Sequence, residues 1–251
     1  MTDVYDRAFF DNLTSGAMDS ARIIVPLAID LIGPRSVVDV GCGEGAWLRV
    51  FADHGIDDYL GVDGNYVDRS RLLIPLDRFR PVALTQLAPL GRSFDLTVCL
   101  EVAEHLSARH APGFIKYLTE LAPVVLFSAA VPGQGGTHHV NERWPWYWQE
   151  QFAENRFVRL DPIRARVWRE PSIDWWYRQN IVVYASTAAV AERPGLSAEY
   201  ARTLDNSLEL IHPRILRAYE ESPRRLLQSL PRAVRSAIRR RLAIRRAPGM
   251  S

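Results

Sequence analysis

The chain has 251 residues, and 47% of them are hydrophobic, which is enough for one medium domain or for one domain with an appendage. No apolar run is long enough to span a bilayer, and the acidic N-terminus lacks a signal-peptide pattern, so we expect a cytoplasmic protein. Only Cys42 and Cys99 are present, which favours two free thiols over a disulfide.

The net charge of +2 conceals an asymmetry along the chain. Residues 222–251 contain nine arginines and no acidic residue, so the remainder carries a net charge of −7. An acidic body argues against binding of long nucleic acid, which needs several phosphate contacts. Apolar residues recur at near-helical spacing among these arginines. The 222–251 tail is therefore either a solvated terminal helix or a basic amphipathic helix for an anionic membrane, a nucleic acid or an acidic partner.

Strands and helices are expected to alternate after a helical segment over residues 1–35. The predicted strands are 36–40, 58–62, 81–85, 94–100, 123–129, 157–160 and 181–184, and the predicted helices include 44–54, 108–121 and 145–155. This order predicts an α/β fold of the Rossmann-like, doubly wound type, with a seven-stranded, mostly parallel sheet and helices on both faces. We predict one domain over 1–190 and a charged helical extension over 191–251. Ligands of such sheets bind beyond the carboxyl ends of the strands.

A turn rich in glycine follows the first predicted strand, with glycines at 41, 43 and 45. These glycines let the backbone approach a ligand closely, and the turn opens onto a helix N-terminus that favours anionic groups. The second strand ends at Asp63, where an acid of a βαβ unit can bind a ribose diol. The spacing also satisfies a dinucleotide pattern. However, Asp39, two residues before the first glycine, suits a cationic ligand better than a pyrophosphate.

The run from Asp39 to Gly45 resembles motif I of the class I S-adenosylmethionine-dependent methyltransferases. The resemblance implies that the first acid and the glycine loop hold the methionine part of this cofactor. Relatives often have Asp-Leu beside the adenine after the third strand, where this chain has Gln86-Leu87. The cofactor residues expected on this basis are Asp39, Gly41, Cys42, Gly43, Asp63, Gly64, Gln86, Leu87, Leu100 and Glu101.

An acidic motif follows the fourth predicted strand and contains Glu101, Glu104 and His105. The spacing i, i+3, i+4 puts all three on one side of a helix, which suits Mg²⁺, Mn²⁺ or Zn²⁺. The alternative is a solvated helix face with a structural histidine. His138 and His139 lie after the fifth strand, at the same edge of the sheet, and can approach this motif.

The Glu-x-x-Glu-His motif resembles two groups of metal-dependent O-methyltransferases, those of small-RNA 3′ ends and those of the ubiquinone pathway. The resemblance implies that Glu101, Glu104 and His105 are metal ligands. A His-x-x-Glu-(x)-Trp register selects His139 as the fourth ligand, whereas a Gly-Thr-His register selects His138; we predict His139. Residues 127–130 and 134–148 also resemble a bacterial group of uncharacterised class I methyltransferases. Without a metal, His105 or His139 could instead act as a general base.

We therefore predict an S-adenosylmethionine-dependent O-methyltransferase with His105 and His139 as catalytic residues and Mg²⁺ or Mn²⁺ as a second cofactor. The predicted acceptor is a hydroxyl of a sugar-containing or diol small molecule or saccharide. Six tryptophans after residue 140 offer flat faces for such a ring, and Arg164 and Arg178 could meet an anionic acceptor. Two alternatives are a ribose 2′-O-methyltransferase for RNA 3′ ends and a non-catalytic protein that binds the cofactor without turnover.

Overall fold

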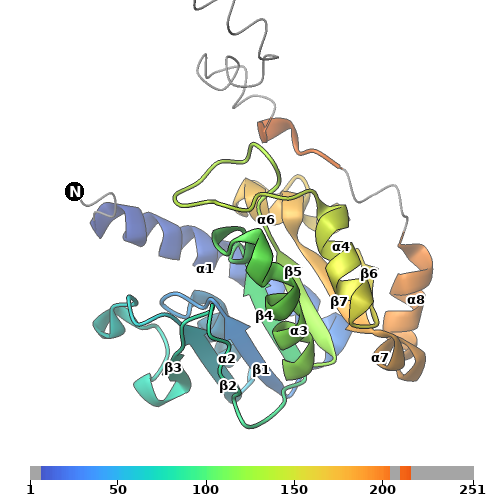
Figure 1. The fold of residues 1–251 in the computed structure, drawn as a ribbon, viewed down its shortest axis with the longest axis horizontal. Coiled ribbons are helices and arrows are strands. Elements are labelled where there is room, and N and C mark those ends of the chain that lie inside the picture. The colour runs from blue at the N-terminus through green and yellow to red at the C-terminus, as the bar shows by residue number, and fades with distance from the viewer. Residues whose placement is uncertain (1–6, 204–209, 216–251) are drawn as a thin grey trace, which may run out of the picture. The chain divides into compact units, whose positions relative to one another are not determined.

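A seven-stranded sheet forms the centre of the computed structural model, which describes residues 7–203 and 210–215 (Figure 1). The strands are β1 (Ser36–Val40), β2 (Asp58–Asp63), β3 (Phe79–Pro81), β4 (Leu96–Leu100), β5 (Val124–Ser128), β6 (Phe157–Leu160) and β7 (Val182–Ser186). Their order is β3-β2-β1-β4-β5-β7-β6. All neighbouring strands are parallel except β7, which is antiparallel to both β5 and β6. The predicted Rossmann-like sheet is confirmed.

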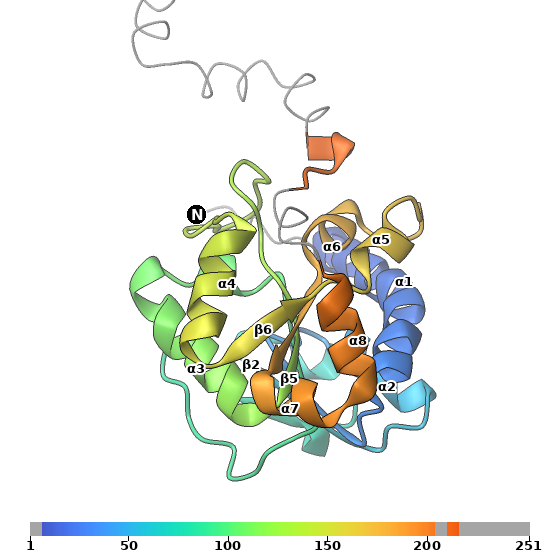
Figure 2. The same cartoon turned by 90° about the vertical axis from the view of Figure 1, so that its right-hand side faces the viewer.

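The helices lie on both faces of this sheet. The α-helices are α1 (Arg7–Ile32), α2 (Ala46–Asp53), α3 (Ala111–Leu121), α4 (Pro145–Glu154), α5 (Arg164–Val167), α6 (Trp175–Asn180), α7 (Thr187–Glu192) and α8 (Pro194–Arg202). Short 3₁₀ turns are η1 (Arg69–Arg71), η2 (Leu76–Arg78), η3 (Ala103–His105) and η4 (Ala108–His110). Figure 2 shows α3 and α4 on one side of the strands and α1 and α8 on the other.

Each face of the sheet has its own apolar core, because successive side chains of a strand point to opposite faces. In β5, Val124 and Leu126 pack with α1 and α2, whereas Val125 and Phe127 pack with α3 and α4. Every residue of β4 and β5 is buried, as expected for central strands covered on both faces. This double cover fixes the central strands, and with them the loops at their carboxyl ends.

Two predicted elements have different bounds in the structure. The third strand is Phe79–Pro81 rather than 81–85, because β2, its only neighbour among the described strands, ends at Asp63 opposite Pro81. The predicted helix over 108–121 begins as the 3₁₀ turn η4 and becomes α3 at Ala111. The helical segment over 1–35 is observed as α1, with Pro26 inside it.

The chain divides into two compact units, Met1–Leu210 and Ile211–Ser251. The predicted boundary at residue 190 falls inside α7, which together with α8 belongs to the first unit. Of the second unit only residues 211–215 are described, so the predicted arginine-rich tail over 222–251 lies outside the described residues. Cys42 and Cys99 are buried free thiols, as predicted. Among the described helices, none has the length and apolarity needed to cross a membrane.

Candidate functional site

The glycine loop connects β1 to α2 at the carboxyl edge of the sheet. Gly41, Gly43 and Gly45 have φ angles of 87°, 53° and 86°, which residues with a side chain rarely adopt. The N–H of Gly41 donates to the carbonyl of Val62 (2.7 Å) and so ties the loop to β2. A Cβ at Gly41 would lie 2.3 Å from Cγ2 of Val102, so the glycine loop directly contacts the segment after β4. The glycine loop and the acidic motif after β4 are thus neighbours.

Two buried aspartates flank this loop. The carboxylate of Asp63 accepts hydrogen bonds from the N–H of Gly43 (2.7 Å), the N–H of Gly64 (2.6 Å) and the hydroxyl of Tyr66. Asp39 is 2% exposed, and its Oδ2 has no hydrogen-bond partner among the described residues. Burial, together with the charge of Asp63, raises the pKa of Asp39 well above its usual value. An unpartnered buried carboxylate suits a cationic ligand.

The remaining predicted cofactor residues lie at three places along the chain. Cys42 is buried in the glycine loop, and Leu100 is buried at the end of β4. Gln86 is exposed, and Leu87 has a φ of 38°; both lie in the loop after β3. This loop begins beside Asp63, because the N–H of Val82 donates to the carbonyl of Asp63 (2.7 Å).

The chain leaves β4 through a strained residue. Glu101 has a φ of 56°, a conformation that costs a non-glycine residue of order 1–3 kcal/mol. Its N–H donates to the carbonyl and to Oγ of Ser128 (both 3.0 Å). Its carboxylate accepts from Nε2 of Gln134 (2.6 Å) and from Nδ2 of Asn180 (3.0 Å). The Glu101 carboxylate is therefore held by two amides and does not belong to the group of potential metal ligands described next.

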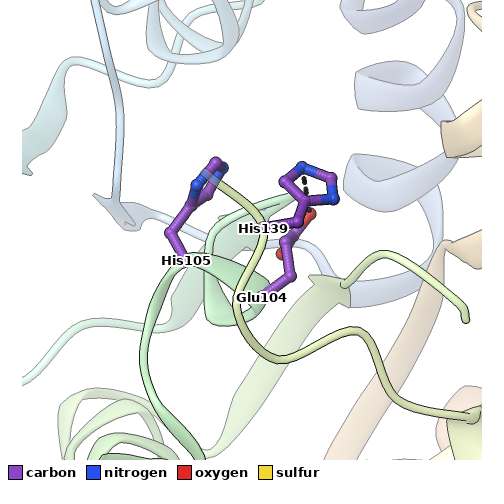
Figure 3. Close-up of side chains that lie close together, drawn as sticks. All are labelled: Glu104, His105 and His139. Atoms are coloured by element: carbon purple, nitrogen blue, oxygen red, sulfur yellow. Dashed lines mark ion pairs between the residues drawn. The ribbon is translucent and has the colours of Figure 1, made fainter. Parts of the chain in front are cut away.

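Glu104, His105 and His139 converge from two segments, as Figure 3 shows. One potential ligand atom from each lies within 4.8 Å of the others. Glu104 comes from η3 and is completely buried, yet neither of its carboxylate oxygens makes a hydrogen bond of normal geometry to the described residues. The two imidazole rings are 4.9 Å apart and nearly perpendicular. This group combines two imidazoles with one carboxylate that lacks a normal hydrogen bond to the described residues.

Burial and neighbouring charges shift the pKa values of Glu104 and His105 in opposite directions. Burial and the negative charge of Glu101 raise the pKa of Glu104 well above its usual value. Burial and the neighbouring His139 lower the pKa of His105, which favours its neutral imidazole. A neutral imidazole can bind a cation or accept a proton, and a divalent cation would compensate the buried carboxylates.

The loop after β5 brings His139, and not His138, into the group. The N–H groups of Val140 and Asn141 both donate to the backbone carbonyl of Glu104 (3.0 Å each), which fixes the loop on η3. Nε2 of His139 lies 4.0 Å from Oε1 of Glu104. His138 is exposed, with a φ of 60°. The geometry thus agrees with the His-x-x-Glu register.

Sequence reasoning missed three residues that shape this site. Oε1 of Glu142 lies at hydrogen-bond distance from Nδ1 of His139 (3.1 Å), and the position of this glutamate three residues after the histidine was the available signal. Gln134 and Asn180, which hold Glu101, are 33 and 79 residues away from it in the chain, and no local pattern indicates that they meet.

The aromatic and arginine residues after residue 140 have mixed roles. Trp148 and Tyr177 are 2% and 8% exposed and pack in the core, against Phe127 and Trp47 respectively. Trp146 is 44% exposed. The guanidinium of Arg164 is buried in an ion pair with Asp161 rather than presented to an acceptor. Part of the predicted aromatic surface is therefore core.

Comparisons with known proteins agree with this architecture. Residues 13–180 match the profile of a family described as "Methyltransferase domain". The structure is similar to that of SAM-bound CalS10, an amino pentose methyltransferase from Micromonospora echinaspora involved in calicheamicin biosynthesis (TM-score 0.54, 14% identity, covering 74% of this chain and 100% of that one). It is also similar to Streptomyces venezuelae DesVI (TM-score 0.53, 14% identity, 73% and 99% covered). No curated protein matches the sequence.

Some similar solved structures are longer than the part of them that this chain matches. The similarity to LaPhzM has a TM-score of 0.48 at 15% identity and covers 71% of this chain, but the chain spans only 58% of the length of that protein. At these identities the likeness concerns the fold.

Proposed function

The chain belongs to the methyltransferase-domain family, and from this premise we propose that it methylates a hydroxyl group of a small molecule with a vicinal diol, such as a sugar, with help from a divalent cation. Family and fold confirm the predicted class I S-adenosylmethionine-dependent methyltransferase. The observation that carries the finer proposal is the convergence of Glu104, His105 and His139 beside the glycine loop, around a buried carboxylate without a hydrogen bond.

The residues around the glycine loop fit S-adenosylmethionine, which supplies a methyl group on a positively charged sulfur. Asp39 offers a buried, unpartnered carboxylate for a cationic ligand. Asp63 is held in place by the N–H groups of Gly43 and Gly64, and in our proposal it accepts from the ribose hydroxyls. Gln86 and Leu87 lie on the loop that begins next to Asp63 and are assigned to the adenine end.

The donor set of Glu104, His105 and His139 combines one carboxylate with two imidazoles. The carboxylate suits Mn²⁺ or Mg²⁺, and the imidazoles favour the transition metal Mn²⁺ of these two, because Mg²⁺ prefers oxygen ligands. A bound cation lowers the pKa of a coordinated hydroxyl and so makes it a better nucleophile. Glu101 supports this site indirectly, since its buried charge adds to the negative potential at Glu104. We assign Glu101 to the potential around the cation, with the Gln134 and Asn180 amides as its direct partners.

The histidines also provide the proton acceptor that methylation of a hydroxyl requires. His105 is exposed as a residue, but neighbouring groups partly desolvate its imidazole and so lower its pKa, which favours the unprotonated form. If no cation is bound, the lone pair of His105 accepts the proton of the acceptor hydroxyl; with the cation bound, that lone pair would hold the metal, and the lowered pKa of the coordinated hydroxyl would let its proton pass to solvent. Exposed apolar side chains near this loop, Val140 (66%) and Trp146 (44%), offer a surface against which a sugar ring can pack.

The proposal is tested by two measurements on the full chain. Titration calorimetry with MnCl₂ should detect binding to the wild type and not to E104Q or H139A. H138N is the matched control, because asparagine tolerates the positive φ at this position and His138 lies outside the metal group. Binding that persists unchanged in E104Q and H139A would refute the assignment of the metal site.

The second measurement is methyl transfer from radiolabelled S-adenosylmethionine to a panel of glycosides. Each glycoside is paired with a deoxy analogue that lacks one hydroxyl of the diol. Transfer should require the diol, stop with EDTA, return with Mn²⁺ and be lost in H105A. Transfer that resists EDTA would refute metal assistance. Cofactor binding without Mn²⁺ binding would favour the non-catalytic partner, and transfer only to an oligoribonucleotide end would favour the ribose 2′-O-methyltransferase.

A further inference from the structure

Glu142 is the centre of a hydrogen-bonded ring within the loop that carries His139. Its Oε2 accepts from the N–H of Gly133 (2.8 Å), and its Oε1 accepts from the N–H of Gly135 (2.7 Å). The same Oε1 lies 3.1 Å from Nδ1 of His139. The Glu142 carboxylate thus links the two ends of the 133–142 loop and contacts Nδ1 of the His139 ring.

We infer that Glu142 is a positioning residue that holds His139 with its proton on Nδ1 and its unprotonated Nε2 turned toward Glu104. This inference rests on the proposed metal-assisted function and names a residue that the function requires. Each oxygen of Glu142 accepts a backbone N–H, which stabilises the ionised carboxylate. An ionised carboxylate can only accept a hydrogen bond, so Nδ1 of the imidazole must be the donor. In a neutral imidazole the other nitrogen then carries the lone pair.

The position of that second nitrogen supports the inference. Nε2 of His139 lies 4.0 Å from Oε1 of Glu104, on the side of the ring that faces the group. Carboxylates behind metal-binding histidines have this arrangement: they fix the tautomer and the ring orientation and increase the basicity of the ligand nitrogen. The same lone pair would be needed if His139 acted as a base without a metal.

The backbone around the ring leaves His139 little freedom. Val140 and Asn141, which follow the histidine in the chain, donate backbone hydrogen bonds to the carbonyl of Glu104. On the other side, a Cβ at Gly136 would lie 2.3 Å from Nε2 of His139, so the ring packs against the bare backbone there. Removal of Glu142 would therefore release a contact that selects which nitrogen points toward Glu104.

The experiment compares E142A and E142Q with the wild type, all as the full chain. E150Q serves as the matched control, because Glu150 is an exposed glutamate on α4. ¹⁵N-labelled histidine NMR of the metal-free protein, with the His139 signals assigned from H139N, reports which nitrogen carries the proton. We expect the Nδ1–H form in the wild type and in E150Q, and loss of that form in E142A. E142Q should keep part of it, because the amide oxygen can still accept.

Titration with MnCl₂ gives the second readout. Mn²⁺ affinity should fall about 10- to 100-fold in E142A and less in E142Q, as for other carboxylates behind metal-binding histidines. S-adenosylmethionine affinity should stay unchanged. An Nε2–H form in the wild type would overturn the inference, and so would unchanged Mn²⁺ affinity in a folded E142A. If E142A does not fold, the tautomer in the wild type and in E142Q decides. A wild type that binds no Mn²⁺ refutes the proposed metal site, whereas the tautomer measurement still tests Glu142.

Discussion

A substitution at Gly136 tests whether the position of the His139 ring controls the site. A Cβ at Gly136 would lie 2.3 Å from Nε2 and 2.4 Å from Cε1 of His139, both inside van der Waals contact. Gly136 is not among the glycines with positive φ, so alanine fits its backbone. G136A therefore acts on one target, the imidazole ring, which must move away from its present position.

The size of the effect follows from the contact that the ring would lose. Moving the ring breaks the hydrogen bond from Nδ1 of His139 to Glu142, and hydrogen bonds to charged groups contribute about 1.5–3 kcal/mol. Since about 1.4 kcal/mol corresponds to a tenfold change in affinity, Mn²⁺ binding should weaken about 10- to 100-fold. The free energy of unfolding should fall by about 0.5–2.6 kcal/mol, because the alanine also stiffens the unfolded chain, which offsets about 0.4–1 kcal/mol of the lost hydrogen bond.

Calorimetric titrations with MnCl₂ and with S-adenosylmethionine, and a thermal unfolding curve, separate these contributions. The matched control is G113A, because the nearest atom to a Cβ at Gly113 is Cδ1 of Leu87 at 4.0 Å. G113A should bind both ligands like the wild type. If G136A is folded and its Mn²⁺ affinity equals that of the wild type, the His139 ring position does not determine the site and the reasoning is refuted.

Three further outcomes follow from the same structure. In EDTA, E104Q should unfold at a higher temperature than the wild type at pH 7.5, by about 2–4 °C for each kcal/mol recovered. The wild type is the less stable protein at this pH because the pKa of Glu104 is raised in the folded state. The contribution of Glu104 to stability is complete below its ordinary pKa of 4.5 and is lost as the pH rises through the folded-state pKa. E104Q should therefore also flatten this pH dependence of stability. G41A should cost about 2–4 kcal/mol in chemical denaturation and abolish S-adenosylmethionine binding, since positive φ and the clash with Val102 add up; normal binding would contradict the role of the loop. R164L should destabilise the fold by up to about 4 kcal/mol, because the Asp161 carboxylate loses its main partner, without raising the KM of a folded sample for the acceptor.

The glycine loop and the sheet could be predicted because their signals are local. A β-branched run followed by glycines at 41, 43 and 45 specifies a strand, a turn with positive φ and a helix start, and all three are present. The alternation of strands and helices then fixes a parallel sheet. Because parallel strands share one carboxyl edge, Glu104 and His139 could be expected to meet from segments 35 positions apart in the chain.

The role of Glu101 could not be predicted in the same way. The i, i+3, i+4 spacing assumes a helix directly after β4, but Glu101 takes a φ of 56° and only the 3₁₀ turn Ala103–His105 follows. A 3₁₀ turn has a different angular step from an α-helix, so the spacing no longer brings the Glu101 carboxylate into one ligand group with Glu104 and His105, although its charge still acts on Glu104. Its amide partners Gln134 and Asn180 come from distant segments, and only the folded chain brings them together.

Asp39 and Glu104 both have carboxylate oxygens without normal hydrogen bonds to the described residues, and both lie at the carboxyl edge of the sheet. We therefore expect cationic ligands to increase the free energy of unfolding. Asp39 lies on β1 next to the glycine loop, and Glu104 follows β4. β1 and β4 are neighbours in the sheet, at the point where the strand order reverses. The buried thiol of Cys99 lies in the same negative potential: burial raises its pKa, and the charges of Asp39 and Glu104 raise it further. Each unpartnered carboxylate costs stability in the free protein, and a ligand that binds only the folded state returns stability in proportion to the logarithm of its concentration over Kd. S-adenosylmethionine and Mn²⁺ should therefore each raise the unfolding temperature of the wild type, and E104Q should abolish the increase with Mn²⁺ while leaving the one with S-adenosylmethionine.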